Sequence, residues 1–328
     1  DALGLLLDAA LDAVNDGALT MDDLKKNGRM AALARLVAYL DAVKFYEMED
    51  SGAWEEIPRL NTSSVGLVVS ALENLDRTTK SDGKRARQFT SAFKRESSKL
   101  GLSTRTSSAN IARMIDRGYE LIGKQLELGG ESPGYDRSDA RFRTADAALL
   151  NLIYPAKLSR LSPEQKYKIM NIVHDLAGDF GIRRYFNDDY QSANFWFKDI
   201  RTDVKEESYA DRRHNYIPGT EAQWFFDSWY AKAWLMLYRD SRDKSDLANA
   251  YKYTNRALGQ FSGRAGKNGG PSLGADGMPV PEFALPESYN FIASGGELWA
   301  VPSPIIPLNW SKASMTLMLK EYEDVLDR

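Results

Sequence analysis

The spacing of apolar residues is the feature that most restricts how this chain can fold. Apolar side chains recur every three or four residues in one segment after another, as at Leu33, Leu36, Val37 and Leu40. That period is the period of one face of an α-helix. Alternating β-branched runs between turn residues, which mark strands, are not found. We therefore expect an all-α fold with about ten helices.

The expected helices can be placed from apolar period and capping residues. In chain order they lie at 3–15, 20–40, 64–75, 80–99, 111–126, 144–153, 163–176, 220–237, 247–258, just after 286, and 309–326. The segment 220–237 is rich in Trp and Phe and nearly apolar all round, which predicts a deeply buried helix.

The connections between these helices alternate in length. Short connections lie at 15–20, 100–105, 155–162 and 240–245, and long ones at 49–63, 128–143, 180–218 and 263–285. If successive helices run antiparallel, every second connection lies at the same end. The long loops then gather at one end, where function is usual. This pattern predicts a toroid of helical hairpins over a single domain, 1–328. A solenoid would show the same alternation, but no sequence repeat is present.

Composition narrows the classes of function. The net charge is -3, so no global basic field argues for nucleic acid. Cysteine is absent, and His174 and His214 lie far apart, which argues against thiolate or zinc sites and a Ser-His triad. No apolar run is long enough to span a membrane, and no signal peptide is visible. The chain starts inside an amphipathic helix without Met, so we interpret its N-terminus as cut. These features leave the compartment open, and we lean toward the cytoplasm.

Two carboxylates stand in the first long loop, at Glu55 and Glu56, directly after Trp54. A helix follows, which one of the residues 62–64 can cap. A helix N-terminus favours an ionised carboxylate, whereas a neighbouring indole raises a carboxyl pKa. A general acid working near neutral pH needs such a raised pKa. The alternative interpretation is a loop that leads into a helix and carries two solvated glutamates without a catalytic role.

A third carboxylate, Glu287, follows Pro286 at the end of the last long loop. The alternation of loops places Glu287 on the same face as Glu55. Two facing carboxyl groups are the minimal equipment for glycoside hydrolysis. A glutamate favoured by the dipole at an expected helix start accounts equally well for Glu287 alone.

The segment from Trp54 to Glu56, with its Ser/Thr-rich helix start, resembles the general-acid segment of glucoamylases, the family 15 glycoside hydrolases. The longer match, from Gly52 through Ser-Ser-Val-Gly-Leu to Ala-Leu-Glu, is closer to the glucoamylase-like domain of phosphorylase kinase alpha and beta subunits. The segments 1–5 and 144–155 resemble that domain too. Leu-Pro-Glu-x-Tyr followed by 307–313 is similar to the glucoamylase ending.

The resemblance implies that Glu55 is the general acid and Glu287 the general base. The segment 181–190, with Trp196, looks like a loop in which an arginine and an acidic residue hold sugar hydroxyls. A surface ion pair is the alternative for these two residues. The sugar-binding residues implied by the resemblance are Trp54, Glu56, Arg184, Asp188 and Trp196.

The chain departs from the family in two places. The resemblance implies an (α/α)6 toroid of twelve helices, whereas about ten are expected here. The family's first helices have no counterpart in this chain, so we expect that they were removed or belong to a separate chain. The insertion 197–218 is absent from glucoamylases. It could form a lid, a subunit contact or a solvated loop, and we favour the solvated loop. We read the basic run 80–99 as a solvated helix face, and the glycine-rich segment 263–270 as a flexible loop without the spacing of a phosphate cradle.

Two functions remain. The first is an inverting hydrolase that acts on α-glucans or α-glucosides from the nonreducing end and needs no metal or organic cofactor. The second is a non-catalytic regulatory or scaffold subunit, related to phosphorylase kinase alpha and beta. Retention of both carboxylates favours the hydrolase. The expected partners are a glucan substrate and, beyond it, a separate N-terminal chain or a second copy of this chain.

Overall fold

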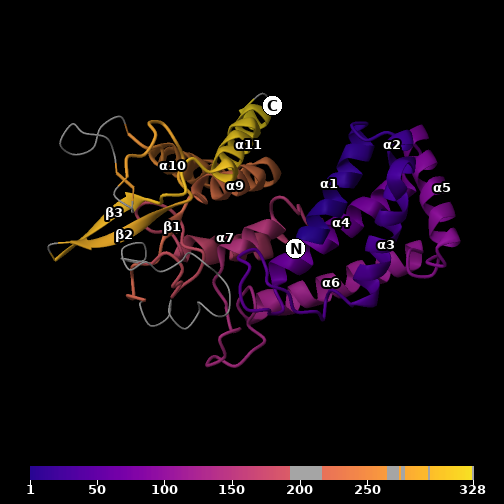
Figure 1. Cartoon of the computed structure of the whole chain (residues 1–328), viewed down its shortest axis with the longest axis horizontal. Coiled ribbons are helices and arrows are strands. Elements are labelled where there is room, and N and C mark those ends of the chain that lie inside the picture. Colours follow the sequence, from indigo (N-terminus) through magenta and orange to yellow (C-terminus); the bar gives the residue numbers. More distant parts are fainter. Residues whose placement is uncertain (193–215, 264–272, 275–277, 295, 327–328) are drawn as a thin grey trace. The chain divides into compact units, whose positions relative to one another are not determined.

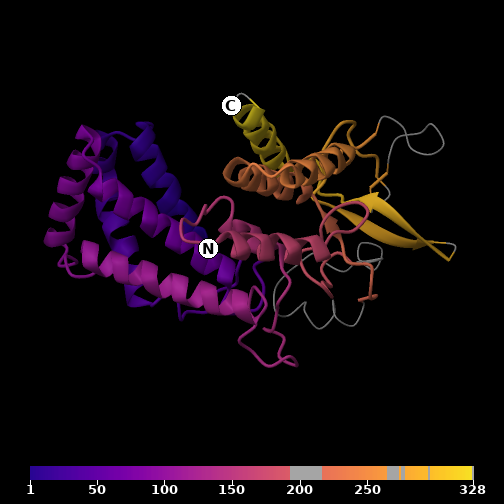
Figure 2. The same cartoon turned by 180° about the vertical axis from the view of Figure 1, so that it is seen from behind.

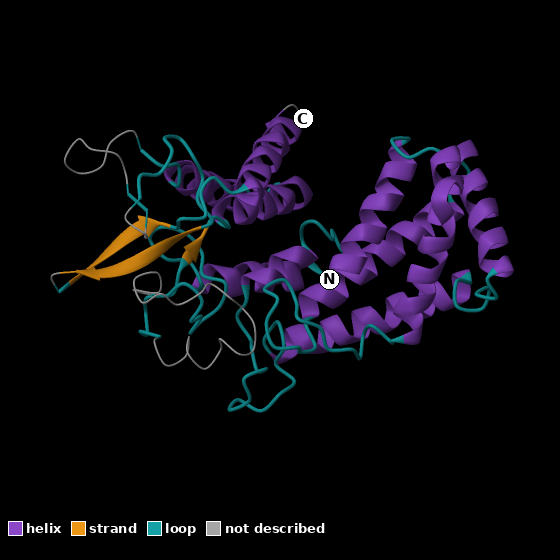
Figure 3. Cartoon of the chain, viewed as in Figure 1, coloured by secondary structure: helices purple, strands orange, loops and turns teal. Residues whose placement is uncertain are grey.

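The structure is a computed structural model that describes residues 1–192, 216–263, 273–274, 278–294 and 296–326 (Figure 1). The chain forms two compact units. Unit 1 contains Asp1–Thr144 and Asn151–Ser162, and unit 2 contains Ala145–Leu150 and Pro163–Arg328. Helices predominate, as the sequence predicts, and a small sheet accompanies them in unit 2 (Figure 3).

Unit 1 is built around one long helix, α4. This helix is buried along nearly its whole first half because α1, α5 and α6 pack against it. The short 3-10 segment η2, Ala147–Leu152, lies where the chain passes between the units. The helices of unit 1 are α1 Ala2–Asp16, α2 Met21–Lys25, α3 Arg29–Ala42, α4 Thr62–Lys80, α5 Lys84–Lys99 and α6 Ser108–Leu128, with the 3-10 turn η1 Lys26–Gly28.

Local sequence explains where the first helices end. Helix α1 stops at Gly17, whose φ of 84° is a left-handed conformation that glycine adopts freely. Thr20 caps α2, as predicted, and forms a capping box with Asp23. The single helix predicted over 20–40 is wrong. Asn27 and Gly28 both have positive φ, and this break separates α2 from α3.

Unit 2 is built around α9, Asp227–Ser241, against which α10, Lys244–Gly259, and α11, Asn309–Leu326, both pack (Figure 2). Every residue from Asp227 to Leu237 is buried, which confirms the burial predicted for this aromatic segment. Helix α7, Pro163–Asp175, begins at the predicted proline.

A three-stranded antiparallel sheet in unit 2 contradicts the prediction that the chain lacks strands. Strand β2, Ser288–Ser294, pairs with β3, Glu297–Pro302, and also with the short β1, Gln223–Trp224. The helix predicted after Pro286 is therefore wrong, since β2 occupies that position. The strand pattern is hidden because the buried face at the start of β2 is polar, formed by Ser288 and Asn290.

Candidate active site

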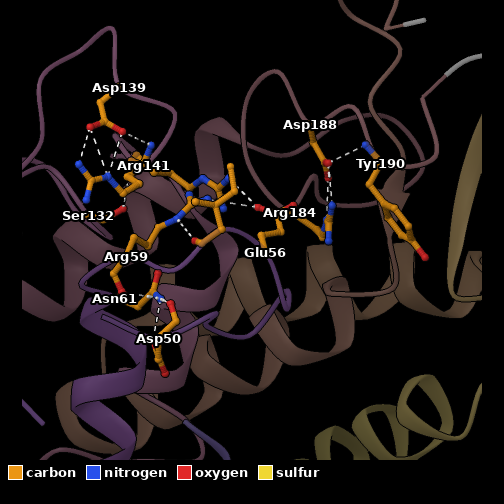
Figure 4. Close-up of polar contacts among 12 residues, drawn as sticks. Asp50, Glu56, Arg59, Asn61, Ser132, Asp139, Arg141, Arg184, Asp188 and Tyr190 are labelled. Carbon is orange, nitrogen blue, oxygen red and sulfur yellow. Dashed lines mark hydrogen bonds and ion pairs between the residues drawn. The ribbon is translucent and has the colours of Figure 1, made fainter. Parts of the chain in front are cut away.

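The loop that carries the first two carboxylates is pinned at its base in unit 1. Asp50 and Arg59 exchange backbone N–H···O bonds of 3.0 Å in both directions. The Asn61 amide donates to the Asp50 backbone oxygen at 2.9 Å and to its Oδ1 at 2.7 Å (Figure 4). Gly52 sits so close to Asn61 that a Cβ there would meet the Asn61 amide. These contacts close the loop 50–61 at its base, and Glu55 lies near its tip.

The two glutamates of this loop, Glu55 and Glu56, have different surroundings. Glu55 is exposed and has a φ of 54°, a left-handed conformation that is uncommon outside glycine. The Glu56 side chain is only 7% exposed and forms ion pairs with Arg143, at 2.8 Å, and Arg59, at 3.5 Å. Trp54 is buried. Glu55 is therefore the carboxylate that faces solvent, whereas Glu56 is held by two arginines.

The carboxylate at the N-terminus of α4 comes from the second long loop, not from the first. Asn61 is the N-cap residue, and its side chain makes no capping bond. The buried Glu131 instead accepts from the Ser63 backbone N–H, at 3.1 Å to Oε2, and from the Ser63 hydroxyl. The helix-dipole effect predicted for Glu55 and Glu56 thus acts on Glu131.

The first and second long loops lie side by side in unit 1, as their alternation predicts. The Tyr135 hydroxyl accepts from the Leu60 backbone N–H at 2.9 Å and donates to Glu49 at 2.8 Å. Within the second loop, Arg141 holds Asp139 through paired hydrogen bonds and lowers the pKa of its carboxyl to about 2 (Figure 4).

In unit 2, Arg184 and Asp188 form a buried two-pronged ion pair. Arg184 Nε and Nη2 each donate to one Asp188 oxygen at 2.7 Å, and Asp188 also accepts from the Tyr190 backbone N–H at 3.0 Å (Figure 4). Arg184 is 2% exposed and Asp188 is fully buried. The alternative of a surface ion pair is therefore wrong for these two residues.

Aromatic rings enclose this arginine. The guanidinium carbon lies 4.7 Å from the ring centre of Tyr190, 5.2 Å from Trp224 and 5.4 Å from Tyr185. Cation–π attraction at these distances is strengthened when the cation is desolvated. Arg184 and Asp188 therefore lie in a packed aromatic cluster, and their role in sugar binding stays a prediction.

Glu287 lies immediately before β2, in the same unit. Gln191 Nε2 donates to Glu287 Oε2 at 2.8 Å, and no other described residue hydrogen-bonds to this carboxylate. Burial raises the pKa of Glu287, while the Gln191 N–H and the positive charge of Arg184 lower it. A carboxylate with one oxygen fixed and the other open suits a proton acceptor.

The structure groups the predicted site residues within the two units. Unit 1 holds Trp54, Glu55 and Glu56, and unit 2 holds Arg184, Asp188 and Glu287. Trp196, most of the 197–218 insertion and most of the glycine-rich segment 263–270 lie outside the described residues.

Sequence reasoning missed two buried polar residues: Gln191, which donates to Glu287, and Glu131, which accepts from Ser63 at the start of α4. A single buried Gln or Glu in a long loop carries no motif, so the sequence offered no signal for either. Among the residues that the structure describes, no group of side chains is arranged to hold a metal ion. No described helix is both long and apolar enough to cross a bilayer.

The fold is similar to that of solved glycosidase structures. Over 98% of its length the chain matches a wild-type glycosidase structure at 14% identity, with a TM-score of 0.52. A glycosidase variant in complex with glucose matches equally widely at 16% identity, with a TM-score of 0.51. The chain covers 66% of each of these proteins. The chain therefore has a glycosidase-like fold.

No family model matches the sequence. The putative protein YgeP of Escherichia coli K12 is 42% identical over 102 residues, which are 31% of this chain and all of YgeP. The uncharacterized lipoprotein YgeQ of the same organism is 49% identical over 51 residues, which are 16% of this chain and 19% of YgeQ. The chain belongs to the same protein family as YgeP.

Proposed function

We propose that this chain carries the catalytic part of an inverting glycoside hydrolase that acts on α-glucans or α-glucosides from the nonreducing end. The observation that carries the proposal is the Glu287 carboxylate, which is largely buried, is held through one oxygen by Gln191, and has no hydrogen bond to a described residue at the other oxygen. The glycosidase-like fold of the chain supports the same class of enzyme.

In the proposed reaction, Glu55 and Glu287 divide the proton transfers between them. Glu55 protonates the leaving glycosidic oxygen, and Glu287 removes a proton from the water that attacks the opposite face of the sugar. Such a mechanism requires the two carboxyl groups to stand about 6.5–9.5 Å apart, with a water between them. An (α/α)6 toroid with its long loops at one rim would supply that arrangement. We propose that this chain is related to the glucoamylases within that class of enzyme.

The remaining predicted residues have supporting roles in this proposal. Arg184 and Asp188 hydrogen-bond to each other. We therefore expect them to hold the wall of the sugar pocket in place, with the edge of their aromatic cluster facing the sugar. Trp54, Glu56 and Trp196 are proposed to bind the sugar or to hold the residues that bind it.

The direct test is hydrolysis of maltose and soluble starch by the purified protein. The wild type should release glucose, and the Glu55→Gln and Glu287→Gln variants should each lose that activity while remaining folded by circular dichroism. A folded wild type without turnover on a panel of α-glucosides would reject the proposal.

A non-catalytic glucoamylase-like subunit is the second candidate. This candidate is favoured by the ion pairs of Glu56 with Arg143 and of Asp188 with Arg184, because these carboxylates bind protein side chains instead of facing a substrate. Such a subunit would bind glucan, a separate N-terminal chain or a second copy of itself. Calorimetric binding of maltoheptaose without any hydrolysis would favour this candidate over the enzyme.

A further inference from the structure

A chain of buried polar side chains ends on the Glu287 carboxylate. Gln191 and Ser288 are fully buried and Asn290 is 2% exposed. Ser288 Oγ lies 2.9 Å from Gln191 Oε1 and 2.8 Å from Asn290 Oδ1, while Gln191 Nε2 lies 2.8 Å from Glu287 Oε2. The four side chains therefore form one continuous path in unit 2.

Counting protons gives this path a direction. The Ser288 hydroxyl has one hydrogen, so it cannot donate to both neighbouring amide oxygens at once. In the same arrangement the Asn290 Nδ2 group is buried and has no hydrogen-bond partner. A buried amide donor without an acceptor destabilises the folded protein.

Turning the Asn290 amide over would end the competition for the Ser288 hydrogen and give the Asn290 N–H an acceptor, with the amide oxygen in the place of the nitrogen. Amide oxygen and nitrogen are told apart only by the hydrogen bonds around them. If the Asn290 amide is turned over, its N–H donates to Ser288 Oγ, and the hydroxyl hydrogen is then used on Gln191 Oε1. The Gln191 N–H is left facing Glu287, and each donor has one acceptor.

Gln191 is also held by its backbone. Its φ of 59° is a left-handed conformation, which is uncommon for a non-glycine residue and persists only when the surroundings enforce it. The side chain thus starts from a fixed backbone and ends on two hydrogen bonds, so it has little freedom to turn away from the carboxylate.

We propose that Gln191 is the positioning residue of Glu287, oriented by a one-way chain of donors that runs from Asn290 through Ser288 to the carboxylate. Gln191 touches the carboxylate and not the reacting atoms, and it directs the open oxygen of Glu287 toward the water that this base would activate. The inference rests on the proposed function for the role of Glu287 as a base, but the contact itself can be tested without activity.

The pH dependence follows from the charges around Glu287. The positive charge of Arg184 lowers the pKa of Glu287, and Asp188 balances that charge. The Gln191 N–H favours the ionised carboxylate, so its loss raises the pKa of Glu287. Because a general base must be ionised, the acidic limb of the activity profile then moves to higher pH.

The first test replaces Gln191 with methionine, which has a similar length but no donor. In the folded Gln191→Met variant, kcat should fall about tenfold to a hundredfold, the acidic limb of kcat should shift to higher pH, and KM should change little. The matched control is Asn74→Leu, because Asn74 is a buried amide of unit 1 that donates to Asp8 at 2.7 Å. Asn74→Leu should lower stability without moving the pH limb. An unmoved limb in Gln191→Met would overturn the inference.

The second test examines the direction of the chain. An aspartate at position 290 has nearly the shape of asparagine but cannot donate when ionised. Asn290→Asp should take the Ser288 hydrogen away from Gln191 and reproduce the shifted limb. An unshifted limb in this variant would show that Ser288 donates toward Asn290, which would overturn the proposed direction.

The third test does not need activity. Urea midpoints are measured at pH 8 for Gln191→Met, Glu287→Gln and the double variant. Contact between the two side chains predicts that the midpoint changes of the single variants do not add in the double variant. Additive changes would overturn the inference. Coupling without any hydrolysis would leave Gln191 as the partner of Glu287 and would reject the proposed function instead.

Discussion

Replacing Arg184 with methionine is the perturbation whose size follows most directly from the structure. The variant removes both 2.7 Å bonds to Asp188 and leaves a fully buried carboxylate with only the Tyr190 N–H. Breaking a buried pair by removing one partner costs about 3–5 kcal/mol. We therefore expect the free energy of unfolding of Arg184→Met to fall by about 3–5 kcal/mol.

The ion pair between Arg117 and Glu120 on α6 provides a matched control. Its N–O distance is also 2.7 Å, but both side chains are more than half exposed. Solvent and salt screen such a pair. Arg117→Met should therefore unfold at the same urea concentration as the wild type.

A double variant separates the charge effect from the loss of packing. In Arg184→Met combined with Asp188→Leu, neither charge of this pair remains in the interior, so part of the lost stability should return. The assay is urea unfolding followed by far-ultraviolet circular dichroism and by tryptophan fluorescence. A loss below about 1 kcal/mol in Arg184→Met, or a double variant as unstable as the sum of its single changes, would refute the reasoning.

Three further predictions concern the carboxylates. Burial raises the pKa of Glu287 above its pKa in the unfolded chain, so the free energy of unfolding falls as the pH rises past the unfolded-state pKa. Glu287→Gln should therefore be more stable than the wild type at pH 8 and equal to it at pH 4. Equal urea midpoints at pH 8 would contradict this. Glu55→Gln should slow maltose hydrolysis by about 10²–10⁴-fold and spare α-glucosyl fluoride, whose leaving group needs no acid; equal losses in steady-state assays would reject the role of Glu55 as general acid. Glu131→Gln should lower the free energy of unfolding by about 1–2 kcal/mol, since it weakens the N-terminal cap of α4, and an unchanged urea midpoint would refute that cap.

The helices were largely predictable from the sequence because their determinants are local. The apolar period placed α1, α6 and α10 to within a few residues of their observed bounds. Capping residues such as Thr20 and the proline at 163 marked the starts of α2 and α7. The same local rule failed at Asn27, where two successive left-handed residues interrupt an apolar period that continues on both sides.

The sheet was not predictable, because tertiary contacts reverse its pattern. Strand β2 buries the polar residues Ser288 and Asn290 in a hydrogen-bond network. Its inward face is therefore not apolar, and the alternation of apolar and polar residues that marks a strand is missing from the sequence. Strand β1 has only two residues and exists because it pairs with β2. Neither feature can be read from a window of local sequence.

For the candidate site, the sequence proposed residues whose surroundings only the structure shows. The sequence selected Glu56 as a sugar ligand, whereas its carboxylate is committed to Arg59 and Arg143, which are remote from each other in sequence. The pair of Arg184 and Asp188 was recognised at its spacing of four residues, but its burial depends on aromatic residues that the fold brings around it.

The anomeric form of the first product tests the central claim most directly. Proton NMR recorded during the first turnovers on an α-linked substrate distinguishes the two anomers of free glucose before they equilibrate. If Glu287 activates water on the face opposite the leaving group, the wild type releases β-glucose first and the Glu287→Gln variant releases none. First appearance of α-glucose, or unchanged release by the variant, would contradict the role of Glu287 as the base of an inverting hydrolase.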